Sequence, residues 1–346
     1  MDYAVEELNE YDFEKWNKFV YAHKELTIFH TIEWKRLLEK TFNFESKYFV
    51  VKNSEGEIVG ISPAFKVKKF LKKIIISMPF FEYGGPFVEK GHEGIYKDIF
   101  NKYKEMVDKG EVSYVKIRSL PEDQSYPIDD IYNKQVEAHD FYLDIQNKTF
   151  DDIWTDFTKD SGVRTAVKKT LKNGVIIKKD QDFENLYNLI IKKDFKLGNP
   201  SFPKIFFENL KNKIINHNII TCYLENKPIS SMISLINNNM MILHQMGSDG
   251  EYLKKASTEI LFVEQIKEAI NRGLDIVDFG RSKPNSHHAK FKEKFNTKQR
   301  NIYAYYYPKT ISEDRYKYLW IENILKKTPW ILSKTPLGNW IRKNNV

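Results

Sequence analysis

The order of helix-like and strand-like segments constrains the fold of this sequence most, because the same order occurs in both halves. Each half has two segments with helical spacing of apolar residues, three strand-like runs, one amphipathic helix and two further strands. The first series extends from Phe13 to Ile145 and the second from about Phe183 to Tyr307. Antiparallel strands followed by a helix that crosses to the next strand predict two α/β units in tandem.

Cap residues support several of these segments. Thr31 is the expected N-cap of a helix at 32–42, and Gly110 is expected to end a helix at 93–110. The other predicted helices cover 13–23, 184–195, 203–214 and 257–273, and the predicted strands cover 46–53, 57–67, 73–80, 112–120, 139–145, 274–280, 301–307 and three runs within 218–248.

Two stretches belong to neither series. Residues 147–182 contain a basic helix, with Asp160 or Ser161 as its cap, then Gly174 and a short strand. The last residues form a basic, amphipathic tail with three of the six tryptophans, which can lie on an anionic membrane or pack against the first unit. We predict domains at 1–146 and 183–308, a linking segment at 147–182 and a tail at 309–346.

Composition limits the function classes. With 346 residues, 41% of them hydrophobic, the chain can form packed cores, and its one cysteine, Cys222, cannot form an internal disulfide and fits a reducing compartment. The acidic amino terminus and the absence of an apolar run of about 18 residues indicate neither a signal peptide nor a spanning helix. A net charge of +8 favours polyanionic partners such as tRNA, nucleotide diphosphates or anionic lipid, although a Lys- and Asn-rich composition can also come from genome bias. We expect a cytoplasmic protein, with peripheral membrane contact through the tail as an option.

The stretch from Ile276 to Arg300 has the strongest chemical signal. A short apolar strand breaks at Gly280, and the next dozen residues contain Arg281, Ser282, Lys290 and Lys292, which suits an anion or an acyl oxygen.

Other parts of the sequence offer little for covalent or metal catalysis. Cys222 lies in a predicted strand, there is no G-x-S-x-G elbow, and the adjacent His287 and His288 project apart on a predicted strand, which disfavours a metal site. The remaining chemistry is direct attack of a substrate amine on an activated ester or thioester, in which the protein holds both substrates and stabilises an oxyanion.

The same stretch resembles a known family. Asp278-Phe279-Gly280-Arg281-Ser282, then Phe291-Lys292 and Phe295, is similar to the carboxyl-terminal signature of the FemAB-like branch of the GNAT acyltransferases. Further similar segments occur in the family's order over most of residues 29–307: Phe29 to Trp34, Tyr83 to Pro86, Leu197 to Pro203, and Phe206-Phe207. The branch contains transferases that add amino acids to peptidoglycan precursors and relatives from exopolysaccharide loci. The resemblance implies an α/β (α+β) fold of tandem duplicated GNAT-like domains, with mixed, mostly antiparallel sheets flanked by helices.

The resemblance also implies roles for particular residues. Lys292 is expected in the catalytic cavity, where its charge could stabilise the oxyanion. Asp278 and His288 are alternative proton acceptors for the amine, and neither spacing nor resemblance decides between them. Arg281 either binds a phosphate or carboxylate or pairs with Asp278. The expected substrate-binding residues are Trp34 in a supporting role, Tyr83, Gly84 and Gly85 in a turn near the ligand, Arg164 and Lys168 on one helix face for phosphates, Arg281, Ser282 and Phe291.

The chain also departs from the family. Phe295-Asn296 stands where relatives have Trp-Gly, and Asn199 where Thr is commoner. The helical arm of roughly 50 residues that some tRNA-dependent members have is missing, which disfavours aminoacyl-tRNA as the donor. The stretch from Gly250 to Ile260 lacks the second glycine of a pyrophosphate loop, which disfavours acyl-CoA.

The predicted function is an acyltransferase that forms an amide on an amino group of a nucleotide- or lipid-linked cell-wall or cell-envelope precursor, without a covalent enzyme intermediate or a tightly bound cofactor. The donor is aminoacyl-tRNA or acyl-CoA. One alternative is an acyl-CoA-dependent N-acyltransferase acting on an amino sugar or peptide in exopolysaccharide biosynthesis. An alternative of another class is a non-catalytic RNA- or nucleotide-binding protein.

Overall fold

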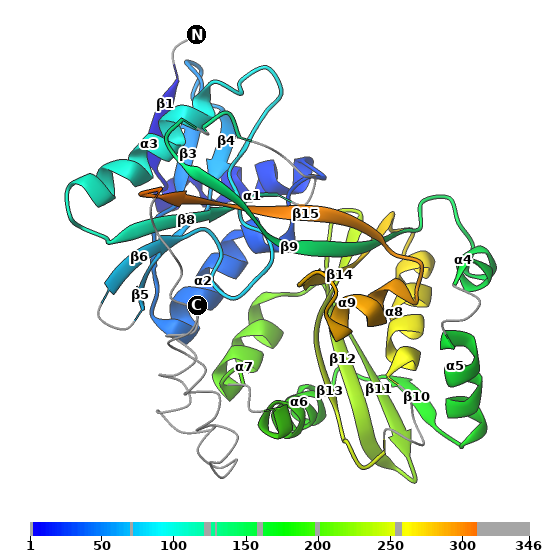
Figure 1. Cartoon of the computed structure of the whole chain (residues 1–346). Helices are drawn as coiled ribbons and strands as arrows, with labels where there is room; N and C mark the ends of the chain where they lie inside the picture. Colours follow the sequence, from blue (N-terminus) through cyan, green and yellow to red (C-terminus); the bar gives the residue numbers. More distant parts are fainter. Residues whose placement is uncertain are drawn as a thin grey trace. The chain divides into compact units, whose positions relative to one another are not determined.

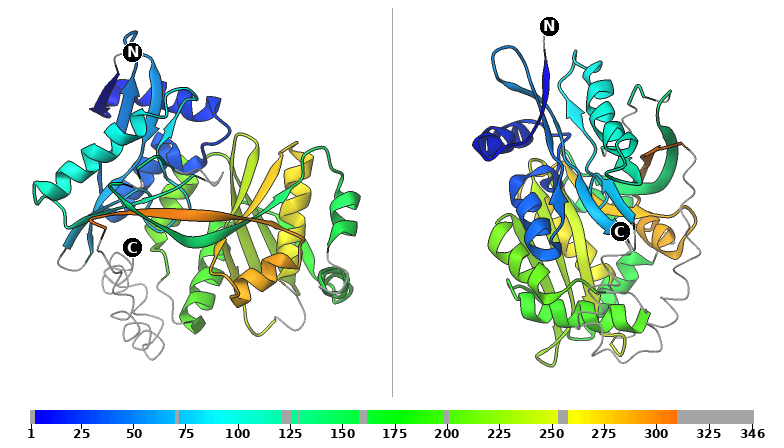
Figure 2. Two further views of the ribbon diagram at one scale, coloured as in Figure 1. Left: turned by 45° about the horizontal axis from the view of Figure 1, so that its top comes forward. Right: turned by 90° about the vertical axis from the view of Figure 1, so that its left-hand side faces the viewer.

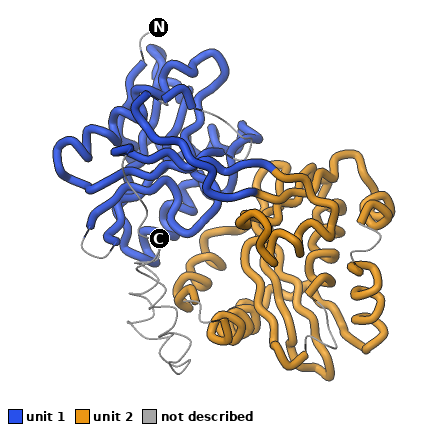
Figure 3. The backbone as a smooth tube through the Cα atoms, viewed as in Figure 1, with its two compact units in different colours: residues 1–139, 300–314, 343–346 blue, residues 140–299, 315–342 orange. Residues whose placement is uncertain are grey.

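The computed structural model describes residues 3–69, 72–120, 126–128, 130–157, 162–197, 201–252 and 258–309. They form two compact units, residues up to 139 together with those from 300 on, and residues 140–299 (Figure 3). Strands β9 (Asn133–Asp144) and β15 (Lys298–Tyr307) each begin in one unit and end in the other. The predicted tail lies, from residue 310 on, outside the described residues, as do the predicted caps Asp160 and Ser161.

The described residues of the first unit form strands of two sheets and three α-helices. The helices are α1 (Phe13–Ala22), α2 (Ile32–Phe42) and α3 (Ile95–Asp108). An antiparallel sheet has the order β1 (Ala4–Glu7), β3 (Phe49–Lys52), β4 (Ile58–Ser62) and β7 (Phe87–Val88). In the other, β15 lies between β9 and β8 (Tyr114–Arg118), followed by β6 (Lys72–Ile76), β5 (Phe65–Lys69) and β2 (Glu45–Ser46). Pairing of β8 with β15 joins Arg118 to Ala304 and Val115 to Tyr307.

Helix α2 forms where the sequence predicted it, and for the predicted reason. The Thr31 side chain accepts a hydrogen bond from the Trp34 backbone N–H at 3.3 Å, and Asn43 ends the helix in a left-handed conformation with φ 56°. Trp34 is fully buried on the inner face and packs edge-on against Phe29 and Phe81.

The second unit contains one mixed sheet with helices on both faces (Figures 1 and 2). Its helices are α4 (Phe150–Asp156), α5 (Val163–Lys172), α6 (Phe183–Leu197), α7 (Lys204–Lys213), α8 (Glu259–Asn271) and α9 (His287–Glu293). The sheet has the order β10 (Ile176–Lys179), β11 (His217–Leu224), β12 (Lys227–Asn237), β13 (Met240–Ser248), β14 (Ile276–Ser282), β9. The pairs from β10 to β13 are antiparallel and β13 pairs with β14 in parallel. No described helix is long and apolar enough to cross a membrane.

Strands β11 and β12 of the second unit's sheet are buried on both faces, whereas the edge strand β10 is largely exposed. Helices α5 and α8 cover one face, where Cys222, Met232 and Val167 belong to the same apolar core. Helix α6 covers the other face, and its backbone approaches β13 so closely at Gly247 that a Cβ there would lie 2.2 Å from the backbone nitrogen of Ile190. Glycine at 247 therefore fixes the height of α6 above the sheet.

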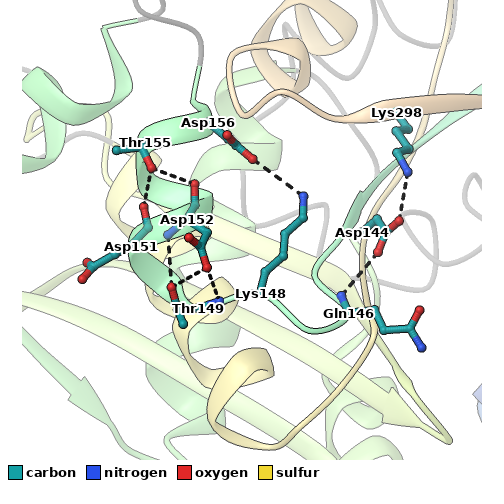
Figure 4. A network of polar contacts seen from close by, with 9 residues as sticks. All are labelled: Asp144, Gln146, Lys148, Thr149, Asp151, Asp152, Thr155, Asp156 and Lys298. Carbon is teal, nitrogen blue, oxygen red and sulfur yellow. Dashed lines mark hydrogen bonds and ion pairs between the residues drawn. The ribbon is translucent and has the colours of Figure 1, made fainter.

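Residues 147–182 are part of the second unit. Helix α4, which the sequence did not predict, starts with a capping box in which the Thr149 hydroxyl and the Asp152 carboxylate bond each other's backbone N–H groups (Figure 4). Lys148 pairs with Asp156 at 3.7 Å, and Lys298 pairs with Asp144 at 2.9 Å in the same view. The predicted basic helix is α5, and the predicted short strand is β10, which pairs with β11 at the edge of the sheet.

Candidate active site

Strands β13 and β14 separate part of the way along their length. Their parallel pairing joins Met240 to Ile276, Met241 to Val277 and Ile242 to Asp278. Both strands continue beyond this register, to Ser248 and Ser282. We call residues 243–248 of β13 and 279–282 of β14 the two arms. Separated arms expose backbone donors and acceptors in the middle of a sheet, and such an opening suits an extended ligand.

Lys292 is held against the β14 arm. It lies on α9, is only 9% exposed, and its ammonium donates to the carbonyl oxygens of Gly280 at 2.7 Å and Arg281 at 3.0 Å. The short helix forms because the Ser286 hydroxyl accepts from the Ala289 N–H at 3.1 Å. These two carbonyl oxygens accept hydrogen bonds from the ammonium and help to fix its position.

Asp278 shapes the same arm from inside the strand. It is fully buried, and its Oδ1 accepts a hydrogen bond from the backbone N–H of Gly280 at 2.6 Å. Gly280 has a φ of 74°, so the strand passes through the left-handed region at the residue whose carbonyl binds Lys292. The predicted strand break at Gly280 is therefore a local twist, because β14 extends two residues further, through Arg281 to the buried Ser282.

Lys193 on α6 holds the β13 arm in a comparable way. Its ammonium donates to the carbonyl oxygen of Met246 at 2.7 Å and has the carboxylate of Asp194 at 3.5 Å. Each arm thus has a lysine bound to its backbone, Lys193 on one and Lys292 on the other.

His288 lies on the exposed side of α9 within the field of both lysines. Partial burial, followed by the positive charges of Lys292, Lys193 and His287, lowers the pKa of His288 from its usual 6.5. The imidazole is therefore neutral at pH 7, the form that can accept a proton.

A β-bulge places another histidine on the β13 arm. Ile233 of β12 pairs with Gln245 and Ser234 pairs with Leu243, so His244 has no opposite residue. Its ring lies 6.2 Å from that of Phe206, and burial lowers its pKa to about 3. Bulges of this kind are common beside active sites, where they redirect a side chain.

Aromatic rings support the β14 arm from the core. Phe291 packs edge-on against Phe262, with ring centroids 5.0 Å apart, and both contact Phe295. Phe262 also stacks on Phe279. Phe291 thus packs next to Lys292 on α9, and Phe295 belongs to the buried core and contacts Phe262, Phe279 and Phe291.

The first-unit residues that the sequence singled out are buried within that unit. A Cβ at Gly85 would lie 2.2 Å from the Tyr126 hydroxyl, and one at Gly84 would lie 2.5 Å from the Met78 Cβ, so both glycines permit close packing. Tyr83 is fully buried, and its hydroxyl accepts from Arg300 at 3.5 Å. With the buried Trp34, these residues shape the interior of the first unit, and their expected contact with substrate stays a prediction.

The two basic residues predicted to bind phosphate, Arg164 and Lys168, lie in different environments. Arg164 donates to the carbonyl oxygens of Trp154 at 3.1 Å and Thr155 at 3.2 Å, and thereby closes the end of α4. Lys168 is exposed on α5. Phosphate binding by this helix also stays a prediction.

One local prediction was wrong, and two residues were missed. His287 and His288 lie in helix α9 and not on a strand, because Ser286 caps a helical turn there. Lys193 and His244 were not predicted, since a lysine in a Lys-rich helix and a bulged strand residue have no local signal. No three described His, Cys, Asp or Glu side chains converge as a metal site requires.

Comparisons with known proteins agree with this architecture. Residues 162–293 match the family model described as an acetyltransferase (GNAT) domain, whereas no curated protein matches the sequence. The crystal structure of FemX superposes with a TM-score of 0.65 at 12% identity, covering 92% of this chain and 100% of that one.

Two further solved structures are similar. The C-terminal domain of a putative lysylphosphatidylglycerol synthetase from Agrobacterium fabrum has a TM-score of 0.57 at 12% identity, with 92% of this chain and 98% of that one covered. A tandem GNAT protein from the clavulanic acid biosynthesis pathway has a TM-score of 0.56 at 9% identity, with 90% and 100% covered. The predicted tandem GNAT fold is confirmed, and the family model places a GNAT acyltransferase domain over the residues that form the two arms.

Proposed function

Because the chain carries a GNAT acyltransferase domain within a tandem fold like that of FemX, we propose that it transfers an activated acyl group to an amine of a cell-envelope precursor. The amine nitrogen attacks the carbonyl carbon of an ester or thioester and forms a tetrahedral oxyanion. Collapse of this intermediate forms the amide bond and expels the alcohol or thiol, which leaves with one proton. The amine gives up a proton to a base. No bond between enzyme and acyl group forms.

The position of Lys292 carries this proposal. A nearly buried ammonium beside the β14 arm provides positive charge where water is scarce, and charge in such surroundings stabilises a developing oxyanion strongly. The two carbonyl partners hold it in place before the substrate arrives, so little reorganisation accompanies the reaction.

His288 is the better supported proton acceptor of the two that the sequence left open. The lowered pKa keeps its imidazole neutral at pH 7, and its position on α9 is two residues from the exposed Lys290 and one turn from Lys292. Asp278 has an oxygen engaged by the Gly280 N–H, which suits a residue that shapes the arm.

The donor group would lie between the two arms, whose strands pair only as far as Ile242 and Asp278. Lys193 and Lys292 each bind a backbone carbonyl of one arm. An aminoacyl group carried by tRNA and an acyl group carried by coenzyme A both fit the chemistry. The match of residues 162–293 to the GNAT acetyltransferase model favours the second candidate function, an acyl-CoA-dependent N-acyltransferase acting on an amino sugar or peptide.

Mass spectrometry of products tests the proposal. The protein is incubated with envelope-precursor mixtures, once with charged tRNA and once with an acyl-CoA panel. A mass gain of one amino-acid residue that RNase abolishes establishes the tRNA donor, and a gain that needs only the thioester establishes the second candidate. Salt-sensitive RNA binding without any amide product would instead support a non-catalytic nucleic-acid-binding protein.

Lys292→Ala and Lys290→Ala form a matched pair for the mechanism, because both residues lie on α9 and only Lys292 is buried. Loss of a charge that stabilises an oxyanion should lower kcat about 100- to 1,000-fold in Lys292→Ala. Lys290→Ala should retain wild-type turnover. Thermal unfolding of both variants separates a catalytic loss from a loss of folded protein.

A further inference from the structure

The turn between α5 and β10 exposes aliphatic and basic side chains together. Leu171 is 48% exposed and Ile176 is 55% exposed, and they flank the exposed residues Asn173 and Gly174. The exposed lysines of the same segment are Lys168, Lys169, Lys172 and Lys178. We call residues 168–178 the α5–β10 tip.

Leu171 and Ile176 stay exposed in the folded unit, whereas Lys178 lies over the ring of Tyr223, 4.9 Å from its centroid. Helix α5 buries Val163, Val167 and Thr170 against the core, and its Arg164 is engaged with the end of α4. β10 is the edge strand of the second unit's sheet, so the tip has the sheet on one side only. The neighbouring turn between β11 and β12 adds one carboxylate, Glu225, against the four lysines of the tip.

Strand register places the tip at the same end of the sheet as the open arms. Ile176 pairs with Tyr223 near the end of β11, and the start of β12 pairs with the end of β13 through Ser230 and Ser248. Because β13 and β14 are parallel, both arms point to this end. Three strand spacings separate β10 from β13, a distance of about 14 Å.

We propose that the α5–β10 tip docks the second unit on an anionic lipid surface, with Leu171 and Ile176 entering the headgroup layer and the lysines contacting acidic lipid. Clusters of lysine beside exposed aliphatic side chains bind such surfaces through charge and apolar burial together. RNA would use the same charge but offers no apolar layer to the two aliphatic side chains.

Docking in this orientation would turn the opening between the arms toward the lipid surface. A lipid-linked acceptor would then reach the arms without leaving the bilayer. This consequence rests on the proposed function, whereas docking itself does not, so the two are measured separately.

The test is sedimentation of the full chain with vesicles of phosphatidylcholine alone or mixed with phosphatidylglycerol. We expect binding to the mixed vesicles only, weakening as salt is added. A triple variant, Lys168→Gln, Lys169→Gln and Lys172→Gln, should bind about 100-fold more weakly, because each lysine removed should lower the affinity by roughly five- to tenfold. A double variant, Leu171→Ser and Ile176→Ser, should also lose affinity while it keeps its salt dependence.

A control variant removes the same charge from the first unit, at the exposed Lys90, Lys97 and Lys102, each changed to glutamine. It should bind mixed vesicles like the wild type. Equal loss in the control, or unchanged binding in both tip variants, would overturn the proposal. Binding of tRNA that needs the tip lysines but not Leu171 or Ile176, without vesicle binding, would overturn it in favour of RNA.

An independent readout follows the tip itself. Asn173→Cys, in a Cys222→Ala background, carries an environment-sensitive fluorophore at the turn, and its emission should shift to the blue when mixed vesicles are added. The same label at Lys102→Cys should not shift. A silent label at 173 on a chain that sediments with vesicles would contradict docking through the tip. Neither measurement depends on turnover, so each stands if no amide product is found.

Discussion

Substitution of Gly247 by alanine tests how closely α6 must approach β13. The new Cβ would lie 2.2 Å from the backbone nitrogen of Ile190 and 2.4 Å from the carbonyl carbon of Leu189. Both atoms belong to the helix backbone and cannot rotate away. To reach an ordinary contact of 3.4 Å, α6 has to move by about 1.2 Å from the sheet.

The cost follows from this displacement. Overpacking of a core lowers the free energy of unfolding by about 1–3 kcal/mol when side chains can adjust. Because a helix backbone cannot adjust in this way, Gly247→Ala should cost about 3 kcal/mol or more. For a unit of this size the melting temperature should fall by roughly 6–12 °C. Helix α6 also carries Lys193, whose ammonium is 2.7 Å from the Met246 carbonyl, so turnover should fall at temperatures where the variant is still folded.

Calorimetry and urea unfolding measure the first effect, and product formation measures the second. Gly94→Ala is the matched control, because no atom lies within 4 Å of the position and its backbone has φ −58°. That variant should be neutral or slightly more stable. A Gly247→Ala protein that melts within 2 °C of the wild type, a limit set from the roughly 2–4 °C expected per kcal/mol, would refute the reasoning.

Three further changes have defined outcomes. Burial lowers the pKa of His30 to about 4 from 6.5, so the stability that the neutral imidazole contributes is complete above pH 6.5 and is lost as the pH falls to 4. In urea unfolding over that pH range, the free energy of unfolding of the wild type should fall by about 3 kcal/mol more than that of His30→Gln. Arg118→Met leaves Glu137 without its bidentate partner at 2.9 and 3.1 Å and should cost about 3–5 kcal/mol in the same assay, with a smaller cost indicating that Lys116 compensates. In a pH–rate profile, the acidic limb of kcat/KM should lie below pH 6.5 and disappear in His288→Gln, and a limb that persists assigns the proton to another group.

Local signals predicted those elements whose caps and periodicity agree. Helix α2 has a Thr cap, an apolar face and an Asn at its end, and its observed bounds are those predicted. Helix α9 was missed because it has only seven residues, three of them lysine or glutamate and two histidine, so helical periodicity is not visible. The boundary between the units could not be read from the sequence either. It depends on the pairing of β15 with β8, whose residues lie 180 or more positions earlier in the chain.

The candidate site divides in the same way. Lys292 and Asp278 could be proposed from the sequence because they lie in one contiguous motif, and their roles stay predictions. The position of Lys193 could not be predicted, because its ammonium binds the carbonyl oxygen of Met246, which is 53 residues away in the chain. The bulge at His244 is a property of pairing between two strands and has no equivalent in either strand alone.

The exchange of strands between the units has a consequence for synthesis of the chain. β8 completes its pairing only with Ala304 to Tyr307, which leave the ribosome after all of residues 140–299. The second unit can therefore close during translation while the first still has an unpaired strand edge. We expect fragments that stop near residue 146 to aggregate through that edge, and addition of a peptide covering β15 to protect them. Among the described strands, β15 is the last to be synthesised, so the sheet that contains β8 is completed only after it.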